Sequence, residues 1–177
     1  MAKLRNFQKF IIHSVIIIVF ICYLFSADYI FNQIITVKGE AKLYNFDLPE
    51  SYSNILFALG EVNQTKIGWK DVIRFDGWAF VERVNAKNQK IFLVLKSESN
   101  KYIFDAVSEY RIDLQVAFKV YDMNLQNAGF NSILSKDVIK DGVYCLGFCL
   151  KNNGETYFSY SNHYFTKSGD AFFQTPY

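Results

Sequence analysis

The 177-residue sequence has few of the residues from which active sites are usually built. It contains two histidines, and the first of them, His13, lies inside a long apolar run. The second, His163, stands in Ser-Asn-His-Tyr, with no cysteine or carboxylate at a spacing that would complete a metal site. We find no glycine-rich phosphate loop, nucleophile elbow or paired-carboxylate motif. The sequence therefore predicts no metal site, no cofactor and no catalytic residue.

Cysteine and net charge are scarce as well. Of the three cysteines, Cys22 lies in the apolar run, whereas Cys145 and Cys149 share the segment VYCLGFCL. Four residues of a strand span about 13 Å, which is too far for a disulfide between the last two, so we interpret both as small core residues. An exported domain without disulfides favours a bacterial envelope.

The net charge of the chain is +2, and its first nine residues carry three positive charges. The rest of the chain is therefore slightly acidic. This balance argues against a nucleic-acid partner and against a basic surface that binds membranes.

The most informative segment is the uncharged apolar run from Phe10 to Ser26. Seventeen helical residues rise about 25 Å, close to the thickness of a bilayer core. Three cations precede the run, and acids outnumber lysines in residues 27–50, so the positive-inside rule places the N-terminus in the cytoplasm. We predict a cytoplasmic tail (1–9), a single transmembrane anchor (10–31), a stalk (32–50) and an extracytoplasmic domain (51–177) at the cell membrane.

A cleaved signal peptide is the alternative interpretation of this run. Cleavage after Ala27 would place Phe25 at the outer recognition position, and cleavage after Ser26 would place Leu24 there. Neither side chain is small, which favours an uncleaved anchor.

The sequence of the exported part is typical of an all-β domain. Short apolar runs alternate with turn-like residues, which predicts an immunoglobulin-like antiparallel β-sandwich. The predicted strands are Ile55–Val62, Val72–Val81, Ile91–Leu95, Tyr102–Ala106, Gly129–Leu134, Val143–Leu150 and Thr156–Phe165. One short helix is predicted, with Asp113 as its N-cap and with Leu114, Ala117, Phe118 and Tyr121 at helical spacing.

Two of these runs have an informative alternation. In Val72–Val81 the apolar parity switches before Trp78, and a bulge near Gly77 would explain the switch. In Thr156–Phe165 one face carries Phe158, Tyr160 and Tyr164 and the other carries Ser159, Ser161 and His163, as in a strand with one wet side.

The most distinctive string is Asp76-Gly77-Trp78-Ala79-Phe80, followed by Arg111-Ile112-Asp113-Leu114, Ala128-Gly129-Phe130 and Asp141-Gly142-Val143-Tyr144. Trp78 is predicted to be a core indole between the sheets, and Gly77 to allow a bulge or a close approach. Arg111 is predicted to pair with a carbonyl or carboxylate at the helix entry, or alternatively to contact a ligand. Asp141-Gly142 is predicted to form a hairpin turn.

These strings resemble, in order and spacing over residues 55–166, a β-sandwich module of bacterial envelope proteins. That uncharacterised module has a GWAF motif, an Arg-Pro-Asp turn, a Gly-Phe strand and a Gly-x-Tyr strand. Here they correspond to Gly77, Trp78 and Phe80, to Arg111 and Asp113, to Gly129 and Phe130, and to Tyr144. Ile112 replaces the proline. The resemblance implies a domain attached to membrane proteins, some of them linked to cell-surface polysaccharide assembly, and implies no activity.

We therefore predict a membrane-anchored, non-catalytic binding module whose partner is an envelope membrane protein or a surface glycan. Trp69, in a predicted turn, is the best candidate for an exposed binding ring, because aromatic rings bind both sugars and proteins. The alternative is an envelope polysaccharide-metabolising enzyme whose acids meet only in the fold. A cleft lined by carboxylates would favour the enzyme, and an open tyrosine-bearing face poor in carboxylates would favour binding.

Overall fold

The computed structural model describes residues 13–24, 26–27, 40–50, 52–68 and 70–176. The chain divides into two compact units, Met1–Lys38 and Gly39–Tyr177. In the first unit, residues 13–24 and 26–27 are helical. Within the described residues, no helix reaches the length and apolar character that a membrane span requires. The predicted tail and both ends of the predicted anchor lie outside the described residues.

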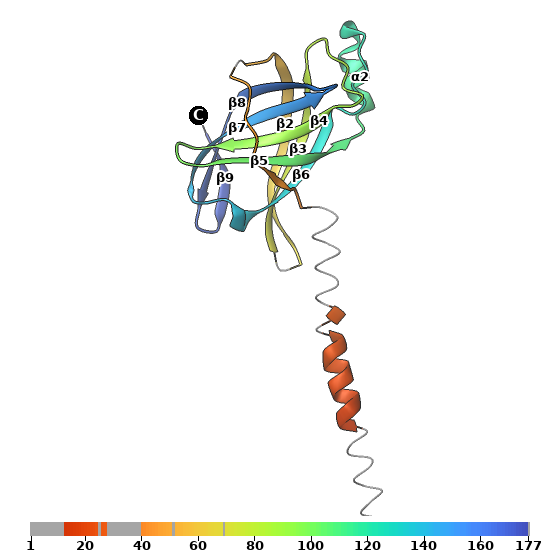
Figure 1. The fold of residues 1–177 in the computed structure, drawn as a ribbon, viewed down its shortest axis with the longest axis vertical. Helices are drawn as coiled ribbons and strands as arrows, with labels where there is room; N and C mark the ends of the chain where they lie inside the picture. Colours follow the sequence, from red (N-terminus) through yellow and green to blue (C-terminus); the bar gives the residue numbers. More distant parts are fainter. Residues whose placement is uncertain (1–12, 25, 28–39, 51, 69, 177) are drawn as a thin grey trace, which may run out of the picture. The chain divides into compact units, whose positions relative to one another are not determined.

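The second unit consists mainly of antiparallel strands (Figure 1). They form one sheet in the order β2-β3-β6-β5-β4-β7-β8-β9, and β1 pairs with β5 outside this path. The strands are β1 (Leu43–Tyr44), β2 (Ile55–Ile67), β3 (Lys70–Val81), β4 (Lys90–Lys96), β5 (Lys101–Glu109), β6 (Gly129–Ser135), β7 (Gly142–Asn152), β8 (Glu155–Ser168) and β9 (Ala171–Thr175). All seven predicted strands are confirmed, whereas β1 and β9 were not predicted.

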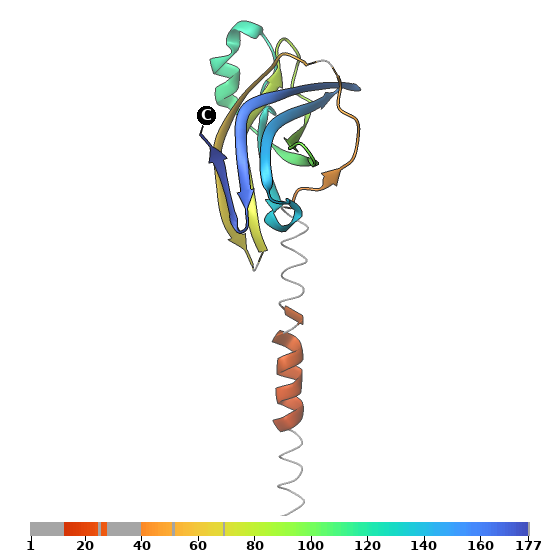
Figure 2. The same cartoon turned by 90° about the vertical axis from the view of Figure 1, so that its left-hand side faces the viewer.

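The sheet curls because β5 has different partners along its length. Residues 101–106 pair with β4, and residues 107–109 pair with β6. The two edges of the sheet approach each other where the Gln64 amide donates to the Phe172 carbonyl at 2.7 Å, which joins β2 to β9. The all-β, antiparallel prediction is confirmed. The two separate sheets of a sandwich are replaced by one continuous, nearly barrel-shaped sheet (Figure 2).

The interior of the curled sheet holds the main core. Alternate residues of each strand point inward, as the period of two requires. Phe75 lies at its centre, with ring centroids 5.6 Å from Phe104, 5.9 Å from Phe165 and 6.0 Å from Phe172. Other fully enclosed members are Ile73, Ile91, Leu93, Leu95, Phe130, Tyr144, Leu146 and Phe148.

Trp78 does not belong to this interior. It is half-buried in a second cluster, which the segment of residues 112–128 forms on the outer face of β3. Its indole stacks on Phe80 at 5.6 Å and meets the edge of Phe118 at 5.3 Å. The prediction of a core indole between sheets is therefore wrong, because the GWAF tryptophan points to the outside of the sheet.

The switch of apolar parity along β3 also arises because both faces of this strand are covered. The register of β3 against β6 is continuous from Val72 to Trp78, so β3 carries no bulge. Both of its faces are apolar because the interior covers one and residues 112–128 cover the other. The bulge near Gly77 lies instead in β2, between Leu59 and Val62.

A segment that we call the strap, residues 40–50 and 52–54, lies across the outer face of β5, β4, β7 and β8. The backbone N–H of Ala41 donates to Ile133 at 2.7 Å, that of Lys42 to the Asp105 carboxylate at 2.6 Å, and that of Ser53 to Phe158 at 2.8 Å. Its apolar side chains cover Phe92, Val94, Ile103, Cys149 and Phe158.

The strap changes the domain boundary that the sequence predicted. Residues 40–50 were predicted as part of a stalk, but Phe46 and Leu48 pack on the sheet. The Lys151 ammonium lies 3.7 Å from the centre of the Phe46 ring. The compact unit accordingly begins at Gly39.

Candidate binding groove

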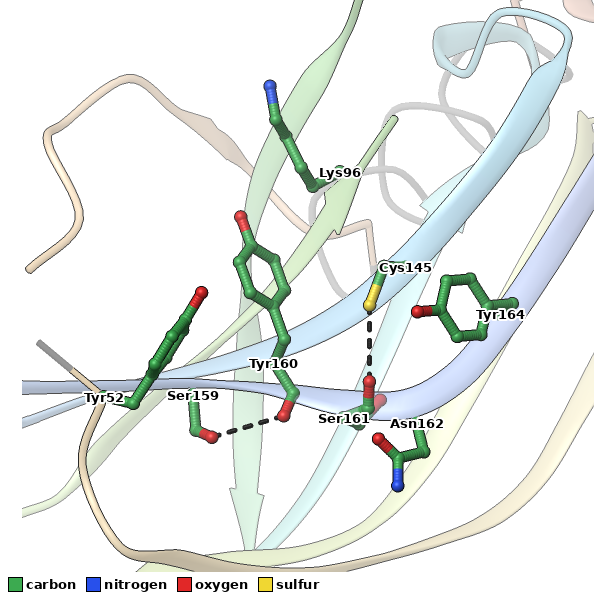
Figure 3. A pocket seen from close by; sticks show the side chains of 8 residues that line it. All are labelled: Tyr52, Lys96, Cys145, Ser159, Tyr160, Ser161, Asn162 and Tyr164. Atoms are coloured by element: carbon green, nitrogen blue, oxygen red, sulfur yellow. Dashed lines mark hydrogen bonds between the residues drawn. The ribbon is translucent and has the colours of Figure 1, made fainter. Parts of the chain in front are cut away.

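An open groove lies on the outer face of the sheet, beside the end of the strap (Figure 3). Its volume is about 650 Å³. The lining residues come from the strap, β4, β7 and β8, and they are Tyr52, Lys96, Cys145, Ser159, Tyr160, Ser161, Asn162 and Tyr164. Figure 3 shows the side chains of Lys96, Tyr52 and Tyr160 projecting to the same side of β8.

A bulge in β8 shapes the groove. Tyr160 pairs with Gly147 and Tyr164 with Cys145, so three residues of β8 lie opposite Leu146 alone. The Ser161 hydroxyl donates to the Leu146 carbonyl at 2.8 Å and accepts from the backbone N–H of His163 at 3.1 Å. These bonds fix the bulge, a device that often re-aims side chains near binding sites.

One side of the groove, which we call the aromatic wall, is formed by Tyr52, Phe158 and Tyr160, and its packing depends on Gly147. A Cβ added at Gly147 would lie 3.0 Å from the Tyr160 ring and 3.1 Å from the Phe158 ring, so the absence of a side chain lets both rings cross β7 closely. Phe158 and Tyr160 pack edge to face at 4.7 Å, and Tyr52 lies 6.1 Å from Tyr160. Tyr52 remains 69% exposed, so the wall ends in a ring that solvent and ligands can reach.

The polar groups of the groove are suited to binding. Burial raises the pKa of the Tyr160 phenol, so the hydroxyl stays neutral and can both donate and accept hydrogen bonds. Burial also raises the pKa of the Cys145 thiol, whose sulfur donates to the Ser161 carbonyl at 3.3 Å. A protonated thiol is a poor nucleophile. Among the described residues that line the groove there is no carboxylate.

A second hollow adjoins the groove, and we call it the turn hollow. It is lined by residues 96–99 of the β4–β5 turn and by residues 141–143, and it shares Lys96, Cys145 and Tyr164 with the groove. Asp141 accepts from the Lys167 ammonium at 3.2 Å and from the Gly169 N–H at 3.1 Å. The Gly169 and Lys167 hydrogen bonds lower the pKa of Asp141, which therefore stays ionised.

Of the two predicted binding residues, Arg111 does not line the groove, and Trp69 lies outside the described residues. The Arg111 guanidinium forms a two-point pair with the Asp113 carboxylate, at 2.8 Å from Nε and 2.6 Å from the terminal nitrogen. This pairing raises the pKa of Arg111 and lowers that of Asp113.

Asp113 is not the helix cap that the sequence predicted. Helix α2 (Ile112–Ala117) begins two residues earlier than predicted, with Arg111 at the N-cap position and without a side-chain cap. The 3₁₀-helix η1 (Lys119–Tyr121) follows α2. The Asp113 carboxylate lies in the first turn of α2, where it binds the Arg111 guanidinium.

The remaining motif residues have packing contacts. A Cβ at Gly77 would collide with the Ala58 carbonyl, and one at Gly129 would lie 2.7 Å from the Glu109 carbonyl. Phe130 is fully enclosed in the interior and Phe80 in the cluster under residues 112–128. The buried Tyr144 hydroxyl donates to the Lys140 carbonyl at 2.8 Å.

Sequence reasoning missed the groove, although one signal pointed to it. The sequence places Phe158, Tyr160 and Tyr164 together on one face of β8, but it predicts that this face is dry. Tyr160 and Tyr164 line the groove instead. On the other face, Ser161 is only 4% exposed, so the predicted wet side is also incorrect at this residue.

Comparison with known proteins adds no further assignment. No protein-family model, curated protein or solved structure matches the chain. Within the described residues, no group of three or more histidine, cysteine or acidic side chains could hold a metal ion.

Proposed function

We propose that this protein is a membrane-anchored, extracytoplasmic and non-catalytic binding module of the bacterial cell envelope, and that it binds a surface glycan in the groove. One observation carries the proposal. The groove is open, it is lined by three tyrosines with hydroxyl and amide groups beside them, and no carboxylate is among its described lining residues.

This combination suits sugars. The apolar face of a pyranose ring packs on an aromatic ring, and its hydroxyls need donors and acceptors around the edge. Tyr52 and Tyr160 supply ring faces and edges, and Ser159 and Asn162 supply polar groups nearby. Two carboxylates converging on one cleft, as most glycoside hydrolases require, are not found among these residues.

The envelope location rests on the apolar run and on the charges around it. Three cations precede Phe10 and none lies between Phe10 and Ser26, which favours an N-terminus in the cytoplasm. A reporter enzyme that is active only outside the cytoplasm, fused after Tyr177, is expected to be active. Activity of a cytoplasm-only reporter at the same position would contradict this topology.

The glycan proposal is tested with the full chain in detergent micelles on an array of bacterial surface oligosaccharides. Tyr160→Ala is expected to weaken binding about tenfold, because a well-packed aromatic contact contributes about 1 kcal/mol or somewhat more. Tyr110→Ala is the matched control, since Tyr110 is 63% exposed and does not line the groove. Absence of binding to any glycan, or equal losses in both variants, would refute the proposal. Cleavage of a bound glycan would favour the enzyme instead.

A further inference from the structure

Lys96 is distinguished by its position. It ends β4 and is the only charged side chain among the described residues that line the groove. It also lines the turn hollow, so it stands where the two hollows meet. Its ammonium forms no hydrogen bond or ion pair with any described residue. A half-buried ammonium without a protein partner is available for an anion supplied by a ligand.

Lys96 and Tyr160 lie on two strands that are separated by β7. Tyr160 pairs with Gly147, which pairs with Val94, two residues before Lys96. Two strand spacings and two residues along the strand separate the two backbones by roughly 12 Å. A ligand that contacts both the Tyr160 ring and the Lys96 side chain therefore extends across β7, from β8 towards β4.

The turn hollow limits where the ligand can carry negative charge. Its lining includes Glu98 and the ionised Asp141, whose carboxylate is paired with the Lys167 ammonium. The negative charge of Glu98 disfavours an acidic group of the ligand beyond Lys96. The groove itself offers neutral phenols, hydroxyls and an amide on the other side of Lys96. The charge pattern across both hollows therefore accommodates one anionic group, with neutral sugar on either side.

We infer that the ligand is an acidic oligosaccharide, with a sugar packed on Tyr160 and a carboxylate or phosphate of the same chain bound by Lys96. This inference rests on the proposed glycan-binding function and specifies its ligand. Lys96 is then the residue that selects acidic over neutral glycans, and Tyr160 contributes affinity to both.

The experiment uses matched pairs of oligosaccharides. Acidic bacterial oligosaccharides, some with uronic acids and some with phosphodiesters, are arrayed beside their carboxyl-reduced or dephosphorylated counterparts. The full chain in detergent is expected to bind an acidic member at least tenfold more tightly than its neutral counterpart. Lys96→Met is expected to reduce this ratio to less than about twofold. Lys96→Arg is expected to restore most of it, because the charge is restored.

Lys101→Met provides the matched control. Lys101 pairs directly with Lys96 across the β4–β5 hairpin, is exposed, and does not line either hollow. The variant removes the same charge from the next strand, and the preference for acidic members is expected to remain. Melting temperatures of the variants establish that each is folded.

The outcomes separate the inference from the function on which it rests. If the parent protein binds neutral and acidic members equally, the inference is overturned and glycan binding stands. Equal losses in Lys96→Met and Lys101→Met would also overturn it, because the preference would then reflect overall charge. If the parent protein binds no member of any pair, the proposed function fails, and the inference fails with it. Preference for uronic acids or for phosphodiesters identifies which anion Lys96 accepts.

Discussion

The cost of removing Phe75 and Trp78 tests which side of β3 faces the main core. Phe75 is fully enclosed among three other aromatic rings in the interior. Truncating a buried phenylalanine to alanine costs about 3–5 kcal/mol through lost transfer energy and a residual cavity. For a chain of this length, Phe75→Ala is then expected to lower the melting temperature by roughly 6–20 °C.

Trp78→Ala is expected to cost less, although tryptophan is the larger side chain. Trp78 is half-buried on the outer face and loses contacts with Phe80 and Phe118 only in part, because solvent already reaches its ring. We expect about 2 kcal/mol, since the area removed from water is smaller than for an enclosed ring. That loss corresponds to roughly 4–8 °C.

The assay is thermal unfolding of the full chain, followed by far-ultraviolet circular dichroism. Phe173→Ala is the control, because Phe173 is 50% exposed beside the buried Phe172, and a change of less than about 0.5 kcal/mol is expected for it. A Trp78→Ala protein that melts at or below the Phe75→Ala protein would refute the assignment of the core to the interior of the curled sheet.

Three further predictions concern titration and reactivity. Burial raises the pKa of Tyr144 to about 12, so this phenol ionises at lower pH in the unfolded chain than in the folded one. The free energy of unfolding is therefore expected to fall between pH 10 and 12, and to fall less in Tyr144→Phe. The pKa of Asp141 is lowered from 3.8 by its hydrogen bonds, so its contribution to stability is complete above that pH and disappears on acidification. Asp141→Asn is therefore expected to flatten the acid limb of a plot of melting temperature against pH, and an unchanged limb would contradict the pairing. Cys149 is buried with its pKa raised to about 11, and the half-buried Cys145 lines the groove, so a thiol reagent is expected to modify Cys145 before Cys149. Faster labelling of Cys149 would contradict the register of β7.

The strands were predictable because their pattern is local. Runs such as Ile91–Leu95 carry apolar side chains on both faces, which is typical of a strand covered on both sides, and β4 has this environment. The curl of the sheet was not predictable in the same way. It arises from the exchange of partners along β5, and periodicity within a strand does not specify its neighbours.

The groove was harder to predict than the fold. Tyr52, Lys96, Cys145 and Tyr160 come from four separate segments, and only the register of β4, β7 and β8 and the path of the strap bring them together. The strap itself contains few apolar residues at regular spacing, and its Leu48-Pro49-Glu50 string resembles a boundary. Trp78 and Asp113 show the complementary error, in which a distinctive residue was assigned the most common role of its type.

The path of the strap has a mechanical consequence. The chain enters this domain beside β6, crosses the sheet, and places Tyr52 in the groove only at the far end of that crossing. Tension applied through the preceding residues would act first on the Ala41–Ile133 and Lys42–Asp105 hydrogen bonds. The contacts of the strap would then break one strand at a time. Tyr52 would be released last, so the aromatic wall would stay complete until most of the strap had been peeled away.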